Sequence, residues 1–126
     1  DLLDPDLLTI RLRISPLDSS PDHSNGKARQ TRELQITLIK PIRLGRVDPK
    51  EGIYPEVDLT DAKKDGVSRE HACIFRRGHA VQVEDLGSTN GTSLNKAKIP
   101  PHQLIPVCHG DILRFGRIAL KVELNK

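Results

Sequence analysis

Aromatic and sulfur-containing residues are scarce in this chain of 126 residues, which has two Phe, one Tyr, two Cys, and no Trp or Met. An apolar core must therefore consist mainly of Leu, Ile and Val, a composition that suits β-strands. The two cysteines are too few for a disulfide framework. The sequence leaves open whether Cys73 and Cys108 are free thiols or form a disulfide.

Long apolar runs are also absent. No stretch approaches the roughly 18 residues of a membrane-spanning helix, and no apolar secretory signal segment is present. The chain begins with Asp1 rather than Met, so we expect a piece of a longer protein. For this piece we expect no membrane contact and a cytoplasmic location, where free thiols are ordinary.

The charge of the chain excludes some classes of function. The formal net charge is only +3, and the Lys and Arg residues are scattered along the sequence. With three aromatic residues there is little surface for stacking bases, so we expect no nucleic-acid partner. The His and Cys spacings match no zinc pattern, and a thiol such as Cys73 in an apolar strand has little reason to ionise. We therefore expect no metal, no cofactor and no catalytic activity.

Alternating apolar residues, interrupted by many Gly and Pro, predict an all-β domain. The clearest alternation places Ile10, Leu12 and Ile14 on one face of a strand. Only one helical turn is expected, at residues 62–64, and no helix of three turns. The predicted strands are 9–14, 33–39, 42–45, 57–59, 72–76, 80–84, 93–95, 97–99, 104–107, 112–115 and 118–124.

The N-terminal part of the chain differs in composition from the rest. Residues 18–27 contain no apolar side chain, which predicts a mobile loop. Such a long loop is unusual within a compact domain, so the strand before it could belong to a flanking region. We favour residues 1–32 as an N-terminal strand plus long mobile loop packed on the sandwich. Residues 33–126 then form the main domain.

The polar stretch from Asp85 to Thr92 follows one of the predicted strands. Asn90-Gly91 is a strong signal for a tight turn, because both residues tolerate positive φ. Ser88 and the residues after it can bond nearby backbone groups. By itself this composition is typical of a well-formed hairpin loop.

Two other predicted strand boundaries carry hydrogen-bond donors. Gly45-Arg46 closes one strand, and Ser68-Arg69 with His71 precedes another. Loops at one end of a β-sandwich lie close together. If these loops and the 85–92 loop share an end, they form a shallow cationic site suited to a tetrahedral anion.

In this order, the three motifs resemble those of a forkhead-associated (FHA) domain, a phosphothreonine-binding module, here of the bacterial type. The resemblance runs from about residue 35 to about residue 123 and implies a β-sandwich of two antiparallel sheets with its binding loops at one end. It also implies the roles of eight residues. The residues expected to bind the phosphopeptide are Arg46, Ser68 and Arg69 at the phosphate, Thr89 beside it and Asn90 on the ligand main chain. The residues expected to support the site structurally are Gly45, His71 and Gly91.

The resemblance further implies a monomeric domain that recognises phosphothreonine in a partner protein, in kinase-dependent signalling or assembly. His71 is expected behind the site, where its ring nitrogens would tie loops together without touching ligand. The alternative is an FHA-like interaction domain that binds an unphosphorylated protein partner. The sequence gives that alternative no support, because all the expected phosphate contacts are present.

Overall fold

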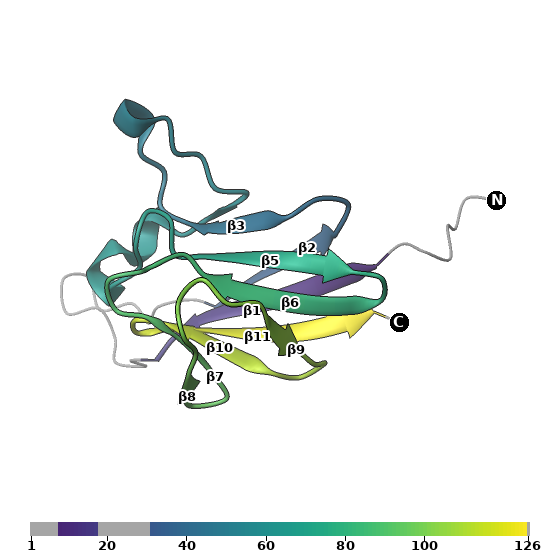
Figure 1. The fold of residues 1–126 in the computed structure, drawn as a ribbon. Helices are drawn as coiled ribbons and strands as arrows, with labels where there is room; N and C mark the ends of the chain where they lie inside the picture. The colour runs from purple at the N-terminus through teal and green to yellow at the C-terminus, as the bar shows by residue number, and fades with distance from the viewer. Residues whose placement is uncertain (1–7, 18–30, 126) are drawn as a thin grey trace.

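The computed structural model describes residues 8–17 and 31–125, which form two β-sheets stacked face to face (Figure 1). One sheet has six strands in the order β2-β1-β11-β10-β7-β8, and the other has five in the order β4-β3-β5-β6-β9. The strands are β1 Thr9–Pro16, β2 Arg32–Thr37, β3 Ile42–Gly45, β4 Val57–Asp58, β5 Ala72–Arg77, β6 Ala80–Asp85, β7 Thr92–Leu94, β8 Ala97–Lys98, β9 Ile105–Val107, β10 Ile112–Phe115 and β11 Ile118–Asn125. The expectation of an all-β sandwich is confirmed.

Helical structure in the described ranges is limited to two short 3-10 helices, η1 (Pro49–Glu51) and η2 (Thr60–Asp65). η2 covers residues 62–64, where the sequence predicts a helical turn, but Ala62 itself lies at a kink with non-helical φ and ψ. Neither helix has the length or the apolar content that a membrane-spanning helix needs.

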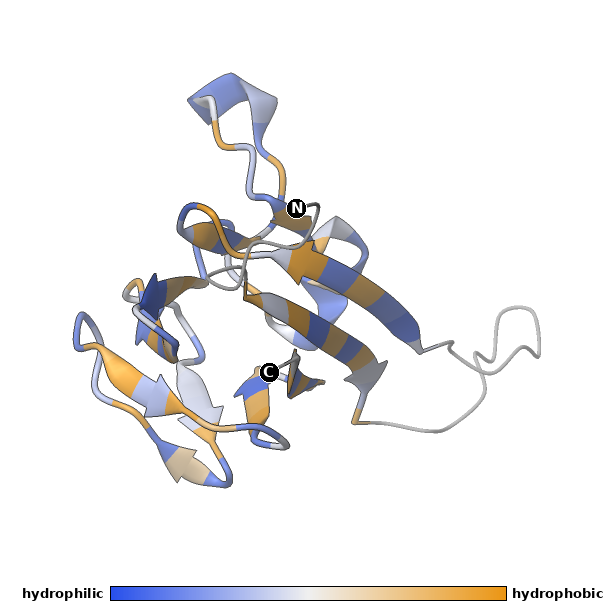
Figure 2. Ribbon diagram, turned by 90° about the vertical axis from the view of Figure 1, so that its right-hand side faces the viewer, coloured by the Kyte–Doolittle hydropathy of each residue, from blue (hydrophilic) through white to orange (hydrophobic). Residues whose placement is uncertain are grey.

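Strand β1 lies inside the six-stranded sheet. It pairs antiparallel with both β2 and β11, so that Ile10 lies opposite Ile36 and Leu124. Ile10, Leu12 and Ile14 are buried while Arg11 and Arg13 between them are exposed, and the same alternation of apolar and polar bands follows the strands in Figure 2. The predicted mobile loop, in contrast, lies outside the described residues.

The five-stranded sheet is built around the β5–β6 hairpin, which turns at Gly78. Strand β4 pairs with β3 in parallel orientation, so the prediction of two antiparallel sheets is wrong for this pair of strands and right for the other pairings of named strands. Pro106 lies in β9 at the edge of the sheet, which is the position where a strand tolerates proline's missing N–H.

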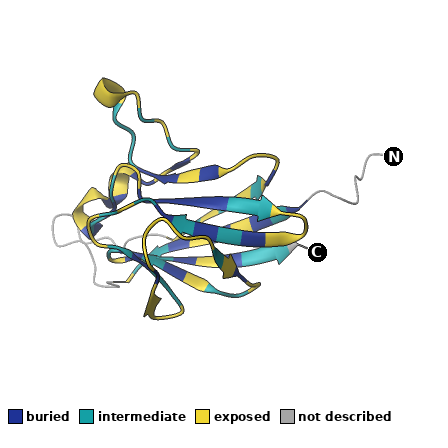
Figure 3. Ribbon diagram, viewed as in Figure 1, coloured by how far each residue is buried: buried dark blue, intermediate teal, exposed yellow. Residues whose placement is uncertain are grey.

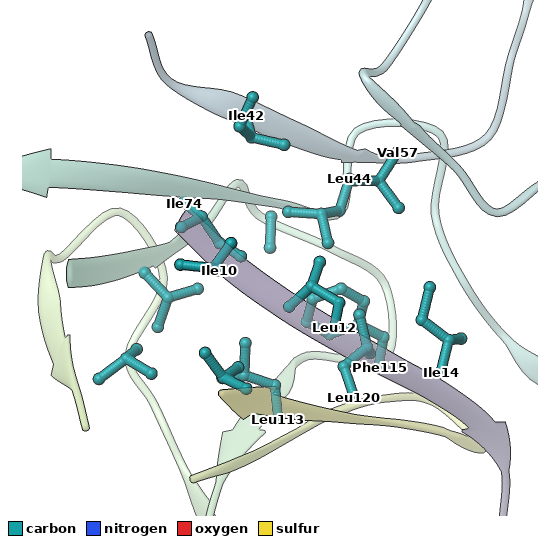
Figure 4. Packing of buried hydrophobic residues seen from close by; sticks show 14 of the residues in the cluster. Ile10, Leu12, Ile14, Ile42, Leu44, Val57, Ile74, Leu113, Phe115 and Leu120 are labelled. Atoms are coloured by element: carbon teal, nitrogen blue, oxygen red, sulfur yellow. The ribbon is translucent and has the colours of Figure 1, made fainter. Parts of the chain in front are cut away.

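The core between the sheets is aliphatic, as the composition predicts. Leu12, Leu44 and Leu120 from three different strands are fully buried and point toward one another in Figure 4. Phe115 is the largest fully buried side chain among the described residues. Figure 3 shows that buried residues line the facing strands and that exposed residues cover the loops.

The connection between β6 and β7 is not a hairpin loop, contrary to the simplest interpretation of Asn90-Gly91. The chain leaves the five-stranded sheet at Asp85 and enters the six-stranded sheet at Thr92, so this loop crosses between the sheets. Gly91 has a positive φ of 79°, whereas the tight hairpin turn follows later, at Asn95 and Lys96 with φ of 50° and 74°. The crossing brings the polar loop to the same end as the β3–β4 and β4–β5 connections, on the left in Figure 1.

Candidate functional site

The end of strand β3 is pressed against the β4–β5 connection. A Cβ atom on Gly45 would lie 1.9 Å from the carbonyl oxygen of Arg69, so only glycine permits this approach. The backbone N–H of Arg46 donates to the same oxygen at 3.0 Å. The side-chain Nε of Arg46 donates to the carbonyl oxygen of Val67 at 2.7 Å, which fixes the half-buried Arg46 guanidinium across the loop.

The β4–β5 connection provides Ser68 and Arg69. The Ser68 Oγ accepts a hydrogen bond from the backbone N–H of Thr89 at 3.0 Å, so the hydroxyl hydrogen remains available to donate. The exposed Arg69 side chain donates to Asp48 on the β3–β4 connection, with 2.6 Å between the guanidinium nitrogen and the carboxylate oxygen. This bond lowers the pKa of Asp48 and raises that of Arg69. The ion pair with Asp48 could not be predicted from the sequence.

His71 is fully buried behind these loops. Its Nδ1 accepts from the backbone N–H of Ser68 at 3.0 Å, and its Nε2 lies 2.9 Å from the carbonyl oxygen of Gly91. Because Nδ1 accepts, the proton is assigned to Nε2, which donates to Gly91. The ring stacks on Phe115 with centroids 4.4 Å apart. Burial lowers the pKa of His71 despite opposing effects of the Gly91 carbonyl and of Asp85, so the neutral ring joins two loops to the core.

Asp85 is a residue whose role the sequence interpretation missed. It is buried, and its carboxylate accepts from the hydroxyls of Ser88 and Thr92 and from the backbone N–H groups of Gly87 and Ser88. Burial alone would raise the pKa of Asp85, but these hydrogen bonds outweigh burial and lower it. An Asp two residues before Gly87-Ser88, within reach of their backbone N–H groups, is a local signal that could have indicated this loop-fixing role.

Thr89 and Asn90 follow on the fixed loop, and both are exposed. The Asn90 Nδ2 donates to the carbonyl oxygen of Gly66 at 2.9 Å. This contact uses one of its two amide hydrogens and leaves the side-chain oxygen unused by other described residues. Asn90 is therefore oriented by the protein and still has a donor and an acceptor for a ligand backbone.

Four of the five predicted ligand-binding residues line one hollow of about 310 Å³, which we call the arginine hollow. Its lining residues are Arg46, Ile53, Ser68, Arg69, Glu70, Gly87 and Thr89. Asn90 is not part of this lining and borders a neighbouring hollow instead. Two guanidinium groups and two hydroxyls on one concave surface can donate several hydrogen bonds to a tetrahedral anion.

The cysteines are separate thiols, which answers the question that the sequence left open. Cys73 is buried in β5, and burial raises the pKa of its thiol to about 11, so it is not a thiolate near neutral pH. Cys108 is exposed and lines neither the arginine hollow nor the hollow bordered by Asn90. Within the described ranges, no three His, Cys, Asp or Glu side chains come together as metal ligands.

In a comparison with known protein families, residues 42–116 match the FHA domain. The FHA domain-containing protein FhaB of Mycobacterium tuberculosis is 38% identical over 90 residues, which cover 71% of this chain and 52% of FhaB. The chain thus spans about half the length of that relative.

Two solved structures share the fold over nearly the whole chain. One belongs to a structural and functional analysis of phosphothreonine-dependent FHA domain interactions; it has a TM-score of 0.65 and 27% identity, and the match covers 94% of this chain and 98% of that one. The other is the FhaA FHA domain complexed with the intracellular domain of Rv3910, with a TM-score of 0.59 and 27% identity over 90% of this chain and 99% of that one.

Proposed function

Because this chain belongs to the FHA domain family, whose members are protein-interaction modules, we propose that it recognises phosphothreonine in a partner protein. The observation that supports this most is the meeting of Arg46, Ser68, Arg69 and Thr89 at the arginine hollow. These residues come from three separate connections, so a hollow with this set of donors is a property of the whole end of the sandwich.

Phosphothreonine has the charge and the acceptors that this hollow would satisfy. It carries about −1.5 to −2 charges at neutral pH and three strong acceptor oxygens. Arg46 is the main anchor in this proposal, because its Nε is already bonded to Val67 and its other N–H groups remain for the ligand. Arg69 adds a second cation, and Ser68 a hydroxyl donor. Asn90 would hold the peptide backbone beside the phosphate.

The proposed partner is a protein phosphorylated by a kinase in the cytoplasm and bound by a monomeric domain. Support comes from the relatives: one solved structure belongs to work on phosphothreonine-dependent interactions, and another FHA domain is complexed with an intracellular domain. We propose no nucleic-acid partner, cofactor or catalysis, because the Lys and Arg residues are scattered along the sequence, aromatic residues for stacking are scarce, and the described residues bring no cluster of metal ligands together.

Calorimetric titration of a phosphothreonine peptide into the Arg46→Ala variant tests the proposal. A lost hydrogen bond to a charged group costs about 1.5–3 kcal/mol, so affinity should fall about tenfold or more. Arg43→Ala is the matched control, since Arg43 is exposed on β3, the strand that ends just before Arg46, and contacts Glu56 rather than the hollow. Equal affinities of wild type, Arg46→Ala and Arg43→Ala would contradict the assignment of Arg46.

A further inference from the structure

Strand β2 is an edge strand with an open side, because it lies first in the order of the six-stranded sheet and pairs only with β1 among the described strands. The other edge strands in the described part of the chain are less open to pairing. Strands β4 and β8 have two residues each, and β9 contains Pro106. Strand β2 has six residues and no proline. A free edge of this length is a template for a further strand.

The open side of β2 presents backbone groups at alternate residues. The N–H of Leu38 donates to the carbonyl oxygen of Leu8 at 2.8 Å, and these two residues continue the register of β2 with β1. Residues along an antiparallel strand alternate between bonding the neighbouring strand and pointing away from it. The even-numbered residues of β2 therefore bond β1. The N–H and C=O groups of Glu33 and Gln35 and the N–H of Thr37 point to the open side.

The apolar residues of β2 are incompletely covered. Leu34 and Ile36 pack against the core, but both are only half-buried. Ile10, which lies opposite Ile36 on the central strand β1, is fully buried. A strand added at the open side would cover the exposed parts of Leu34 and Ile36. Strand β2 therefore offers unpaired backbone groups and apolar surface to the same partner.

The sequence of β2 is complementary to itself in the antiparallel direction. When two copies pair around a twofold axis at Gln35, Glu33 lies opposite Thr37 of the second copy, and Leu34 lies opposite Ile36. In this register the outward-pointing backbone groups meet, two apolar cross-strand pairs form, and no carboxylate faces another. A register centred on Leu34 would instead place Ile36 opposite an arginine.

We propose that β2 pairs with β2 of a second copy of this chain, antiparallel and centred on Gln35, so that the two six-stranded sheets become continuous. One strand of six residues per copy is far smaller than the roughly 20–30 residues a side of a stable interface, so the dimer is weak. At low concentration the chain is the monomeric domain of the proposed function. Strand β2 contributes no residue to the arginine hollow, so the inference does not depend on that function.

Sedimentation equilibrium of the protein between about 10 µM and 1 mM, where weak complexes associate, tests this pairing. The average mass of wild type should rise from that of one chain toward that of two. Gln35→Glu and Gln35→Lys each place like charges opposite one another at the axis, so the dissociation constant should rise about threefold or more. An equimolar mixture of the two variants places opposite charges there and should associate more strongly than either variant alone. Gln103→Glu and Gln103→Lys, at an exposed position outside β2, are the controls and should associate as wild type does.

Gln35→Pro tests the backbone hydrogen bonds separately. It removes an N–H that points away from β1, so the domain should remain folded, which its melting temperature at low concentration checks. The loss of two hydrogen bonds across the axis should weaken the dimer about tenfold.

Three results would overturn the inference: a wild type that stays monomeric throughout, association that is unchanged in the Gln35 variants, or a mixture that associates no better than its components. Phosphopeptide affinity, measured at low concentration, should be the same in wild type and in the Gln35 variants. Failure of the phosphopeptide to bind would overturn the proposed function alone, so the two failures can be distinguished.

Discussion

The β6–β7 and β3–β4 connections reach the same end of the sandwich, but they are held in different ways. The β6–β7 loop receives its shape from buried groups, since Asp85 accepts four hydrogen bonds within it and His71 bonds the carbonyl oxygen of Gly91. The β3–β4 connection projects from the sheets in Figure 1 and is largely exposed in Figure 3. Arg46, at the start of this connection, is bonded to the carbonyl oxygens of Val67 and Arg69, but further along the chain the tie to the site is the ion pair between Asp48 and the exposed Arg69.

This difference indicates a site with one rigid side and one adjustable side. Buried hydrogen bonds to a charged group are worth more than exposed ion pairs, which solvent and salt weaken. Thr89 and Asn90 are therefore expected to be preorganised, whereas Arg69 can exchange Asp48 for a ligand anion. Changes behind the rigid side should lower stability and binding together, and changes on the adjustable side should alter binding alone.

The strongest test of this contrast replaces one aspartate in each connection. Asp85→Ala leaves the Ser88 and Thr92 hydroxyls and two backbone N–H groups without their acceptor, and should lower the free energy of unfolding by about 3 kcal/mol or more. Asp48→Ala, the matched control, should leave the urea midpoint nearly unchanged. Asp85→Asn, which keeps the volume and one acceptor oxygen, should fall between the two. Equal urea midpoints for all three variants would contradict the contrast.

Replacement of His71 should have the next largest effect. His71→Ala removes two hydrogen bonds and the stacking on Phe115 from a fully buried position, so unfolding should become easier by about 2 kcal/mol or more. Phosphopeptide affinity should fall as well, because Ser68 and Gly91 lose their common support. His79→Ala, at the exposed β5–β6 turn, is the control and should change neither property. Loss of affinity with unchanged thermal stability would instead make His71 a direct ligand contact.

A smaller effect should follow from the protonation of His71. Burial holds its pKa in the folded protein below the ordinary value of about 6.5, so the unfolded chain binds a proton first as the pH falls. Stability is therefore retained above about pH 6.5 and decreases as the pH falls below that value. Urea denaturation at about pH 7.5 and about pH 5.5 should show this loss in wild type and less of it in His71→Gln. The same loss in both proteins would assign it to other groups.

Much of the fold could be predicted because a strand buried on one face has apolar and polar residues at alternating positions of the sequence. The alternation of Ile10, Leu12 and Ile14 identified β1 and its inward face, and the scarcity of aromatic residues predicted the aliphatic core. The parallel pairing of β4 with β3 could not be predicted, because a two-residue strand has no period. The signal at Asn90-Gly91 identified a turn but not which strands it joins, and the structure uses it to cross between sheets.

For the candidate site, the sequence identified the residues but not the contacts that hold them. Arg46, Ser68 and Arg69 could be selected because each follows or precedes a predicted strand. The bond from Arg46 to Val67 and the pair of Arg69 with Asp48 each join residues 21 positions apart, and such partners leave no local signal. The close approach of Gly116 to the end of η2 could not be predicted for the same reason, since it joins residues far apart in the sequence.

The central claim is that the arginine hollow recognises phosphothreonine, and three matched peptides test it most directly. They carry phosphothreonine, phosphoserine or unmodified threonine at one position and are titrated into the wild-type domain by calorimetry. We expect binding of the phosphothreonine peptide, no measurable binding of the threonine peptide, and several-fold weaker binding of the phosphoserine peptide, because one buried methyl contributes roughly 0.8 kcal/mol. Equal affinity for the phosphothreonine and threonine peptides would contradict the claim.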